Sequence, residues 1–168
     1  MLPDSVRYLV ADGYYYRFKL WNAVRDADLN LIGKLRADAN FNYIYTGERN
    51  KRGAPRKYDG KVDCNNLKKL TFIKKVKPGV KLYSLVVWSC CLKCKIRLAC
   101  LSELQPNGKI KNILLFSTDI NLPTQQILEY YQAVFRLSLF FAMPNNLRVY
   151  LILNVAVVNG FIFILMPV

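Results

Sequence analysis

Apolar and polar positions near the start of the chain follow a strand–helix–strand order. Residues 7–11 form a short apolar run of β-forming side chains that stops at Asp12. Residues 18–29 then space their apolar side chains three to four positions apart, which predicts a helix with one apolar face. Residues 31–37 (LIGKLRA) have the composition of a second strand. A unit of this kind is typical of parallel sheets, so we expect the two strands to be parallel neighbours.

The middle of the chain changes to a β pattern. Three β-rich runs lie at 79–89, 92–102 and 109–119. The sequence QPNGK separates the second run from the third, and Asn-Gly is a strong hairpin signal. Residues 41–117 therefore predict an antiparallel β unit, inserted between the strand–helix–strand unit and a later helix.

The later helix is predicted to begin near Thr124, because a proline directly before it suits a helix start. At about 100° per residue, four of its positions fall on one stripe. These positions are Tyr131, Val134, Ser138 and Asn145. Taken alone, the stripe indicates a mildly apolar face that packs on a core.

The tail at 149–168 contains no charged residue and is about long enough to cross a bilayer as a helix. Three interpretations stay open. The tail is a transmembrane helix with Arg148 at its cytoplasmic edge, a buried helix of a domain, or a segment translated in a shifted frame. For the fold as a whole, we expect a C-terminal apolar helix here.

The charge distribution adds a candidate function. The chain has a net charge of +14 and no histidine, so chemistry built on imidazole is excluded. Residues 49–81 hold twelve Lys or Arg against two Asp, interleaved with tyrosine, glycine and proline. Such a segment predicts an exposed arm that neutralises phosphates. The expected DNA-binding residues are Arg49, Lys51, Arg52, Arg56, Lys57, Lys61, Lys68 and Lys69.

The start of the chain lacks the pattern of a signal peptide, which predicts a cytoplasmic protein with reduced cysteines. Cys91 and Cys94 form a CxxC pair, a spacing that zinc sites use. Cys64 and Cys100 are the candidates to complete four ligands, and that spacing matches no common zinc module. We therefore interpret the cysteines as small apolar residues on strands.

Asp12 is a candidate site residue on chemical grounds. A carboxylate at the end of an apolar strand, followed by Gly13, lies where open α/β sheets place their sites. The same position is also common for a turn or helix-cap residue, and the local sequence leaves both interpretations open.

The order of four segments resembles a known family. YLVADGYY, LIGKLRADANFNYIYTG, KRGAPRKYDGK and LLFSTDINLPTQQILEYYQAVF follow one another as in the C-terminal half of bacterial insertion-sequence DDE transposases with a Tyr-Arg-Glu-Lys signature. The resemblance covers residues 6–141. It implies a ribonuclease H-like fold whose three carboxylates bind two Mg²⁺ ions, which cleave and join DNA. The implied partners are the DNA of transposon ends and another transposase copy.

The resemblance also assigns roles to individual residues, and at several of these positions the chain departs from the family. Asp12 falls on the second catalytic Asp, and Tyr131 on the signature Tyr, while Asp119 is outside the catalytic trio. The strand with the first catalytic Asp would precede these residues. The charged signature residues Arg, Glu and Lys fall on Val134, Ser138 and Asn145. One carboxylate cannot hold two Mg²⁺ ions, so we expect an inactive fragment in which Asp12 is the sole metal ligand.

The combined expectation is an α/β protein with a partial ribonuclease H-like fold, an inserted antiparallel β unit and the apolar C-terminal helix. Its parts are expected at 1–40 (core), 41–118 (β insertion with the basic arm), 119–146 (signature helix) and 147–168 (apolar tail). The expected function is DNA binding by a transposase relative. The alternative is a small membrane-anchored basic protein that binds anionic lipid or nucleic acid.

Overall fold

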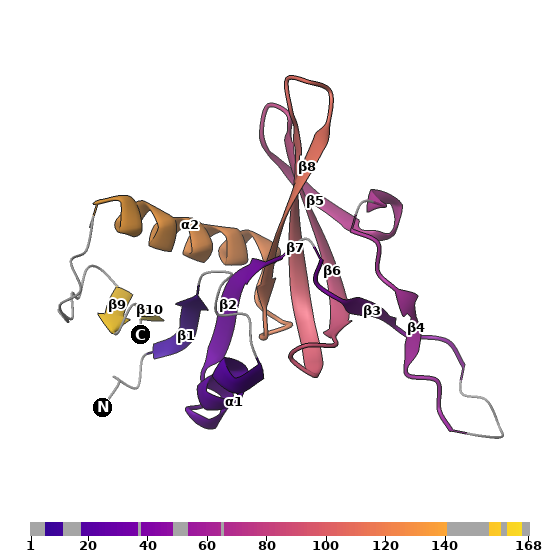
Figure 1. Cartoon of the computed structure of the whole chain (residues 1–168), viewed down its shortest axis with the longest axis horizontal. Coiled ribbons are helices and arrows are strands. Elements are labelled where there is room, and N and C mark those ends of the chain that lie inside the picture. The colour runs from indigo at the N-terminus through magenta and orange to yellow at the C-terminus, as the bar shows by residue number, and fades with distance from the viewer. Residues whose placement is uncertain are drawn as a thin grey trace.

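The computed structural model describes residues 6–11, 18–36, 38–48, 54–64, 66–140, 155–158 and 161–165 (Figure 1). These residues contain ten strands of one sheet and two α-helices. The strands are β1 (Val6–Ala11), β2 (Asn30–Leu35), β3 (Phe41–Ile44), β4 (Tyr58–Lys61), β5 (Thr71–Lys77), β6 (Val80–Ser89), β7 (Cys94–Leu104), β8 (Ile110–Ser117), β9 (Val155–Val158) and β10 (Phe161–Leu165). The helices are α1 (Phe18–Asp26), the short 3₁₀ helix η2 (Leu67–Lys69) and α2 (Thr124–Phe140).

The strands follow the order β4-β3-β6-β7-β8-β2-β1-β10-β9, and β5 pairs with the first half of β6. β1 and β2 are parallel with α1 between them in the chain, which confirms the predicted strand–helix–strand unit. The pairs among β3 to β8 are all antiparallel, as the β pattern predicted. The predicted hairpin joins β7 to β8, with Gly108 at φ 77°, and α2 begins at Thr124.

The expected fold class is wrong. The chain is mostly one mixed β-sheet with two helices, rather than a ribonuclease H-like α/β core with an apolar C-terminal helix. The physical reason is the pairing of β8 with β2, which runs antiparallel from Ile32 opposite Ser117 to Leu35 opposite Leu114. This pairing makes the antiparallel strands a continuation of the same sheet.

The expected apolar helix at the C-terminus is wrong as well, because the described part of the tail forms two strands. β9 and β10 pair antiparallel, with Phe161 opposite Val158, and β10 then pairs with β1. Val, Ile and Phe favour strands, and the sequence Asn159-Gly160 between the two runs is a hairpin signal. No helix in the described part of the chain has the length and apolarity needed to cross a membrane.

Both faces of the sheet are buried around β1, β2, β7 and β8. On one face, Leu98 and Phe116 pack with Trp21 and Val24 of α1. On the other face, alternate residues of the same strands pack with Ile127 and Leu128 of α2. Figure 1 shows α1 and α2 on either side of these strands. Because successive side chains point to opposite faces, burial on both sides explains why residues 98–101 of β7 and 113–116 of β8 are uninterrupted apolar runs.

A polar anchor fixes the start of α2 on the sheet. The Thr124 hydroxyl donates to Ser84 Oγ of β6 at 2.7 Å, and both side chains are buried. Arg97 of β7 donates through Nε to the Ile120 carbonyl at 2.7 Å and through Nη1 to Ser84 Oγ at 3.3 Å. These bonds satisfy polar groups that burial would otherwise penalise.

The junction between β2 and β8 depends on a glycine. Gly33 lies opposite Phe116, and a Cβ at position 33 would come within 2.9 Å of Phe116 Cε1 and 3.1 Å of the Ala11 carbonyl oxygen. Just beyond the ladder, the Leu31 N–H donates to Thr118 Oγ1 at 2.9 Å, and the Thr118 N–H donates to the Leu31 carbonyl at 3.0 Å. The absence of a side chain at Gly33 lets the buried Phe116 ring lie directly on the strand.

We expect Gly33→Ala to lower the free energy of unfolding by about 1–3 kcal/mol, because the added methyl overpacks a site that holds a buried ring and a backbone carbonyl. Urea denaturation measures this change. Lys34→Ala, at the exposed neighbouring position of the same strand, is the control and should stay within about 0.5 kcal/mol of the wild type. Equal stability of the two variants would contradict the close contact at Gly33.

Candidate nucleic-acid interface

The predicted catalytic positions fall mostly outside the described residues. β1 ends at Ala11, and Asp12 lies outside the described range, as does Asn145. Tyr131 lies on α2 and is half-buried against the core on that face of the sheet. Ser138 belongs to α2 by its backbone, and its side chain is not among those described. The assignment of these residues to a catalytic site therefore stays a prediction.

The Mg²⁺ expected from the resemblance needs several hard oxygen ligands. Within the described residues, no three Asp, Glu, Cys or His side chains are placed to hold a metal ion. At the position of the family's metal-binding glutamate, this chain has Ser138, whose hydroxyl is a weaker donor than a carboxylate. The donors among the described residues therefore do not form a two-metal centre.

Asp119 links β1 to the loop between β8 and α2. Its Oδ2 accepts a hydrogen bond from the Tyr8 hydroxyl at 2.7 Å, and its Oδ1 accepts one from the Asn121 N–H at 2.9 Å. Burial, and after it the hydrogen bond to Asp119, raises the pKa of the Tyr8 phenol above its ordinary value. Both carboxylate oxygens thus hold local structure together.

The five cysteines are all thiols. Cys90 and Cys91 are exposed in the turn between β6 and β7, whereas Cys94 is half-buried and Cys100 is buried on β7. Burial raises the pKa of Cys94 to about 11 and, with a smaller contribution from nearby Cys64, that of Cys100 to about 12. These two thiols are therefore neutral near pH 8.

The predicted DNA-binding residues that the structure describes lie at the end of the sheet formed by β3 and β4 and on η2. Figure 1 shows this end of the sheet on the far side from α2. Five of the eight predicted residues are described, and all are exposed: Arg56, Lys57, Lys61, Lys68 and Lys69. The other three, Arg49, Lys51 and Arg52, lie outside the described residues.

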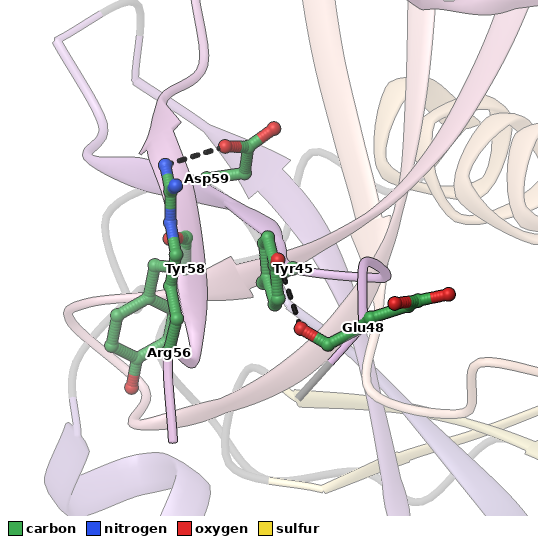
Figure 2. Close-up of polar contacts among 5 residues, drawn as sticks. All are labelled: Tyr45, Glu48, Arg56, Tyr58 and Asp59. Atoms are coloured by element: carbon green, nitrogen blue, oxygen red, sulfur yellow. Dashed lines mark hydrogen bonds and ion pairs between the residues drawn. The ribbon is translucent and has the colours of Figure 1, made fainter. Parts of the chain in front are cut away.

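Arg56 is held by neighbours at the base of the basic arm (Figure 2). Its Nη2 pairs with Asp59 Oδ1 at 2.7 Å, and its Nε donates to the Tyr58 carbonyl at 3.0 Å. Its guanidinium also lies 5.0 Å from the centre of the Tyr45 ring, and the Tyr45 hydroxyl donates to the Glu48 carbonyl at 3.2 Å. Arg56 therefore connects Tyr45 with Tyr58 and Asp59, and Asp59 offsets part of its charge.

Lys69 lies over the aromatic ring of Tyr43, on β3. Its Nζ is 4.7 Å from the centre of the Tyr43 ring, a cation–π arrangement. The Asn66 side chain accepts from the Lys68 N–H at 3.3 Å and caps η2, which fixes the backbone of both lysines. The neutral Tyr43 ring does not cancel the charge of the Lys69 ammonium group. Lys68 and Lys69 are both exposed and therefore present positive charge to solvent.

Four lysines on β5 and β6 form a second basic region, which we call the β5–β6 lysines: Lys74, Lys75, Lys77 and Lys81. Lys75 lies directly opposite Lys81 across the ladder, and both are exposed. The ion pairs found in the described part of the chain are made by arginines, so these lysines have no acidic partner there.

Sequence analysis did not predict the pairing of Lys81 with Lys75, because the pattern within one strand does not identify the residue opposite on the neighbouring strand. The available signal was Pro78-Gly79, a turn dipeptide directly between two β-rich runs. Gly79 has φ 78° in the structure, and β5 and β6 pair on either side of it.

We expect a thiol reagent near pH 8 to modify Cys90 and Cys91 in the folded protein. Cys94 and Cys100 should stay unmodified until the protein is unfolded. The raised pKa values of Cys94 and Cys100 leave almost no reactive thiolate at either position. Peptide mass spectrometry, before and after addition of denaturant, identifies the modified positions. Rapid modification of Cys100 in the folded protein would contradict its placement in the core.

Comparison with known proteins gives no assignment for this chain. No model of a protein family matches the sequence, and neither a curated protein nor a solved structure matches it.

Proposed function

We propose that this chain binds DNA through its exposed basic residues on β4, η2, β5 and β6, as a relative of insertion-sequence transposases. The observation that carries the proposal is the cross-strand pair Lys75 and Lys81. Like charges directly opposite each other destabilise a sheet, and the described residues place no acidic side chain in ion-pair contact with either one. A polyanion supplies the missing negative charge.

Protection of a sheet edge accounts for only part of this arrangement. Lysines on an edge strand prevent unwanted pairing with other chains, and β5 has neighbouring strand β6 on one side only. That explains Lys74, Lys75 and Lys77. It does not explain Lys81, because β6 pairs with β5 on one edge and with β7 on the other. An extra lysine on the inner strand supports a role in binding.

Phosphate contacts suit this surface better than base-specific contacts. Lys61, Lys68 and Lys69 add exposed charge on β4 and η2, and flexible ammonium groups neutralise phosphates without selecting a sequence. The resemblance supports DNA, and in particular transposon ends, as the polyanion. We place the protein in the cytoplasm, where DNA is accessible in bacteria and where its five thiols stay reduced.

We expect this chain to bind DNA without cleaving it. The resemblance assigns a metal-binding glutamate to position 138, where this chain has serine, and an arginine to position 134, where it has valine. Without a carboxylate at position 138, the trio lacks a ligand that the two-metal mechanism needs.

We expect the double variant Lys75→Gln/Lys81→Gln to bind a DNA duplex more weakly than the wild type, because the two substituted side chains no longer neutralise phosphates. Fluorescence anisotropy over a range of salt concentrations measures both affinity and salt dependence. The slope of log K against log salt should become shallower by about 0.9 for each phosphate that the variant leaves unneutralised.

The matched control is Lys19→Gln/Lys34→Gln, which removes the same charge from exposed positions on α1 and β2. It should keep the wild-type slope. An equal decrease in affinity in both double variants would show only a general effect of net charge, and would contradict a binding surface at β5 and β6.

A further inference from the structure

The face of the sheet that α2 covers continues past the helix onto β6, β3 and β4. α2 packs on β1, β2, β7 and β8, and its first residue, Thr124, is bonded to Ser84 of β6. Positions 86 and 88 of β6 lie beyond that point on the same face, since alternate residues share a face. No described helix covers this region, whereas its opposite face is packed by Val62 and Leu70.

The strand register places one row of side chains across this open face. Lys61 of β4 lies opposite Asn42 of β3, Asn42 opposite Trp88 of β6, and Trp88 opposite Lys95 of β7. The lysines at both ends are exposed, and Trp88 between them is half-buried. A large aromatic side chain is thus flanked by positive charge on either side.

A second aromatic side chain completes the open face. Tyr58 of β4 lies opposite Ile44, on the same side as Lys61, and is 36% exposed. Its ring centre is 5.7 Å from that of Trp88, with the ring planes at 46°. We call Tyr58, Lys61, Trp88 and Lys95 the aromatic platform.

We infer that the aromatic platform binds single-stranded DNA, with bases stacked on Tyr58 and Trp88 and the backbone neutralised by Lys61 and Lys95. The inference rests on the proposed function, because it takes DNA as the ligand and adds the form of DNA that this face accepts. Unpaired bases stack on exposed aromatic rings, and basic side chains beside the rings hold the phosphates. In a duplex the base faces are already stacked on one another, so a flat aromatic face offers them little.

Two alternative roles fit this face less well. Packing between Tyr58 and Trp88 across the sheet accounts for their mutual contact, but not for a lysine at each end of the row. Docking of a second copy of the chain would bring the lysines of two platforms together in a symmetric contact, where like charges repel.

The test compares wild type with Tyr58→Leu in binding a labelled oligothymidylate and a duplex of equal length. Tyr58 is on a strand at the end of the sheet, where substitution spares the core. We expect Tyr58→Leu to weaken binding of the single strand by about 5- to 150-fold, the range for removal of one base–aromatic stack, and to leave duplex affinity unchanged. Phe72→Leu is the matched control, because Phe72 is an aromatic residue of β5, 54% exposed, that contacts Tyr83 on the other face.

Tryptophan fluorescence of the unmodified protein gives a second measurement. Stacking of a base on Trp88 should quench its emission. Trp21, the chain's other tryptophan, is buried between α1 and the sheet and supplies a constant background. Quenching by oligothymidylate, but not by the duplex, would support the platform.

Several results would overturn the inference while leaving the proposed function in place. The first is a loss of single-strand affinity that is equal in Tyr58→Leu and Phe72→Leu. The second is tighter binding of oligouridylate than of oligothymidylate. The third is quenching of tryptophan emission that depends on protein concentration instead of DNA concentration. The last result would identify a second copy as the occupant. Failure of the wild type to bind either form of DNA would overturn the proposed function and the inference with it.

Discussion

The pairing of β2 with β8 is the contact on which the rest of the structure depends. It joins two parallel strands to a set of antiparallel ones, and it fixes which residues of each strand point to which face. A shift by one residue would exchange Leu115 with Phe116 and move each into the other core. Gly33 and the buried Phe116 ring fit together in only one register, and the mutual hydrogen bonds between Leu31 and Thr118 extend the same alignment.

From this register follows the division between an end of the sheet that both helices cover and an end that they leave uncovered. α1 and α2 cover opposite faces around β1, β2, β7 and β8, where apolar side chains alternate into two cores. Neither α1 nor α2 reaches β3 or β4, and among the described residues it is the segment around η2, with Val62 and Leu70, that packs against one face there. Exposed lysines and aromatic rings therefore collect at the uncovered end, where burial does not oppose them.

Local pattern predicted the elements well and their long-range pairing poorly. The β1–α1–β2 unit, the β7–β8 hairpin and the start of α2 at Thr124 each follow from signals within a few residues of one another. The pairing of Ile32 with Ser117 joins positions far apart in the sequence, and no local rule specifies it. At the tail, length and lack of charge suggested a helix, while β-branched residues around Asn159-Gly160 favoured strands, and the second signal was correct.

The candidate site shows the same limit of local reasoning. Composition located the basic segment, and the structure shows that its residues are not equivalent. Arg56 is occupied by Asp59 and Tyr45, whereas Lys81, which composition did not single out, has Lys75 as its cross-strand neighbour. The positions that the transposase resemblance assigns to catalysis, Asp12 and Ser138, stay predictions.

The sheet keeps a repulsive lysine pair, on our proposal, because a polyanion binds it. The stability of Lys81→Gln without DNA tests this claim most directly. We predict that the free energy of unfolding of the variant is about 0.2–1 kcal/mol higher than that of the wild type, because the substitution relieves the repulsion between the two opposed like charges. The difference should shrink as salt screens the repulsion. A variant that is equally or less stable at low salt would contradict the proposal, since Lys81 would then be a structural residue with no repulsion to explain.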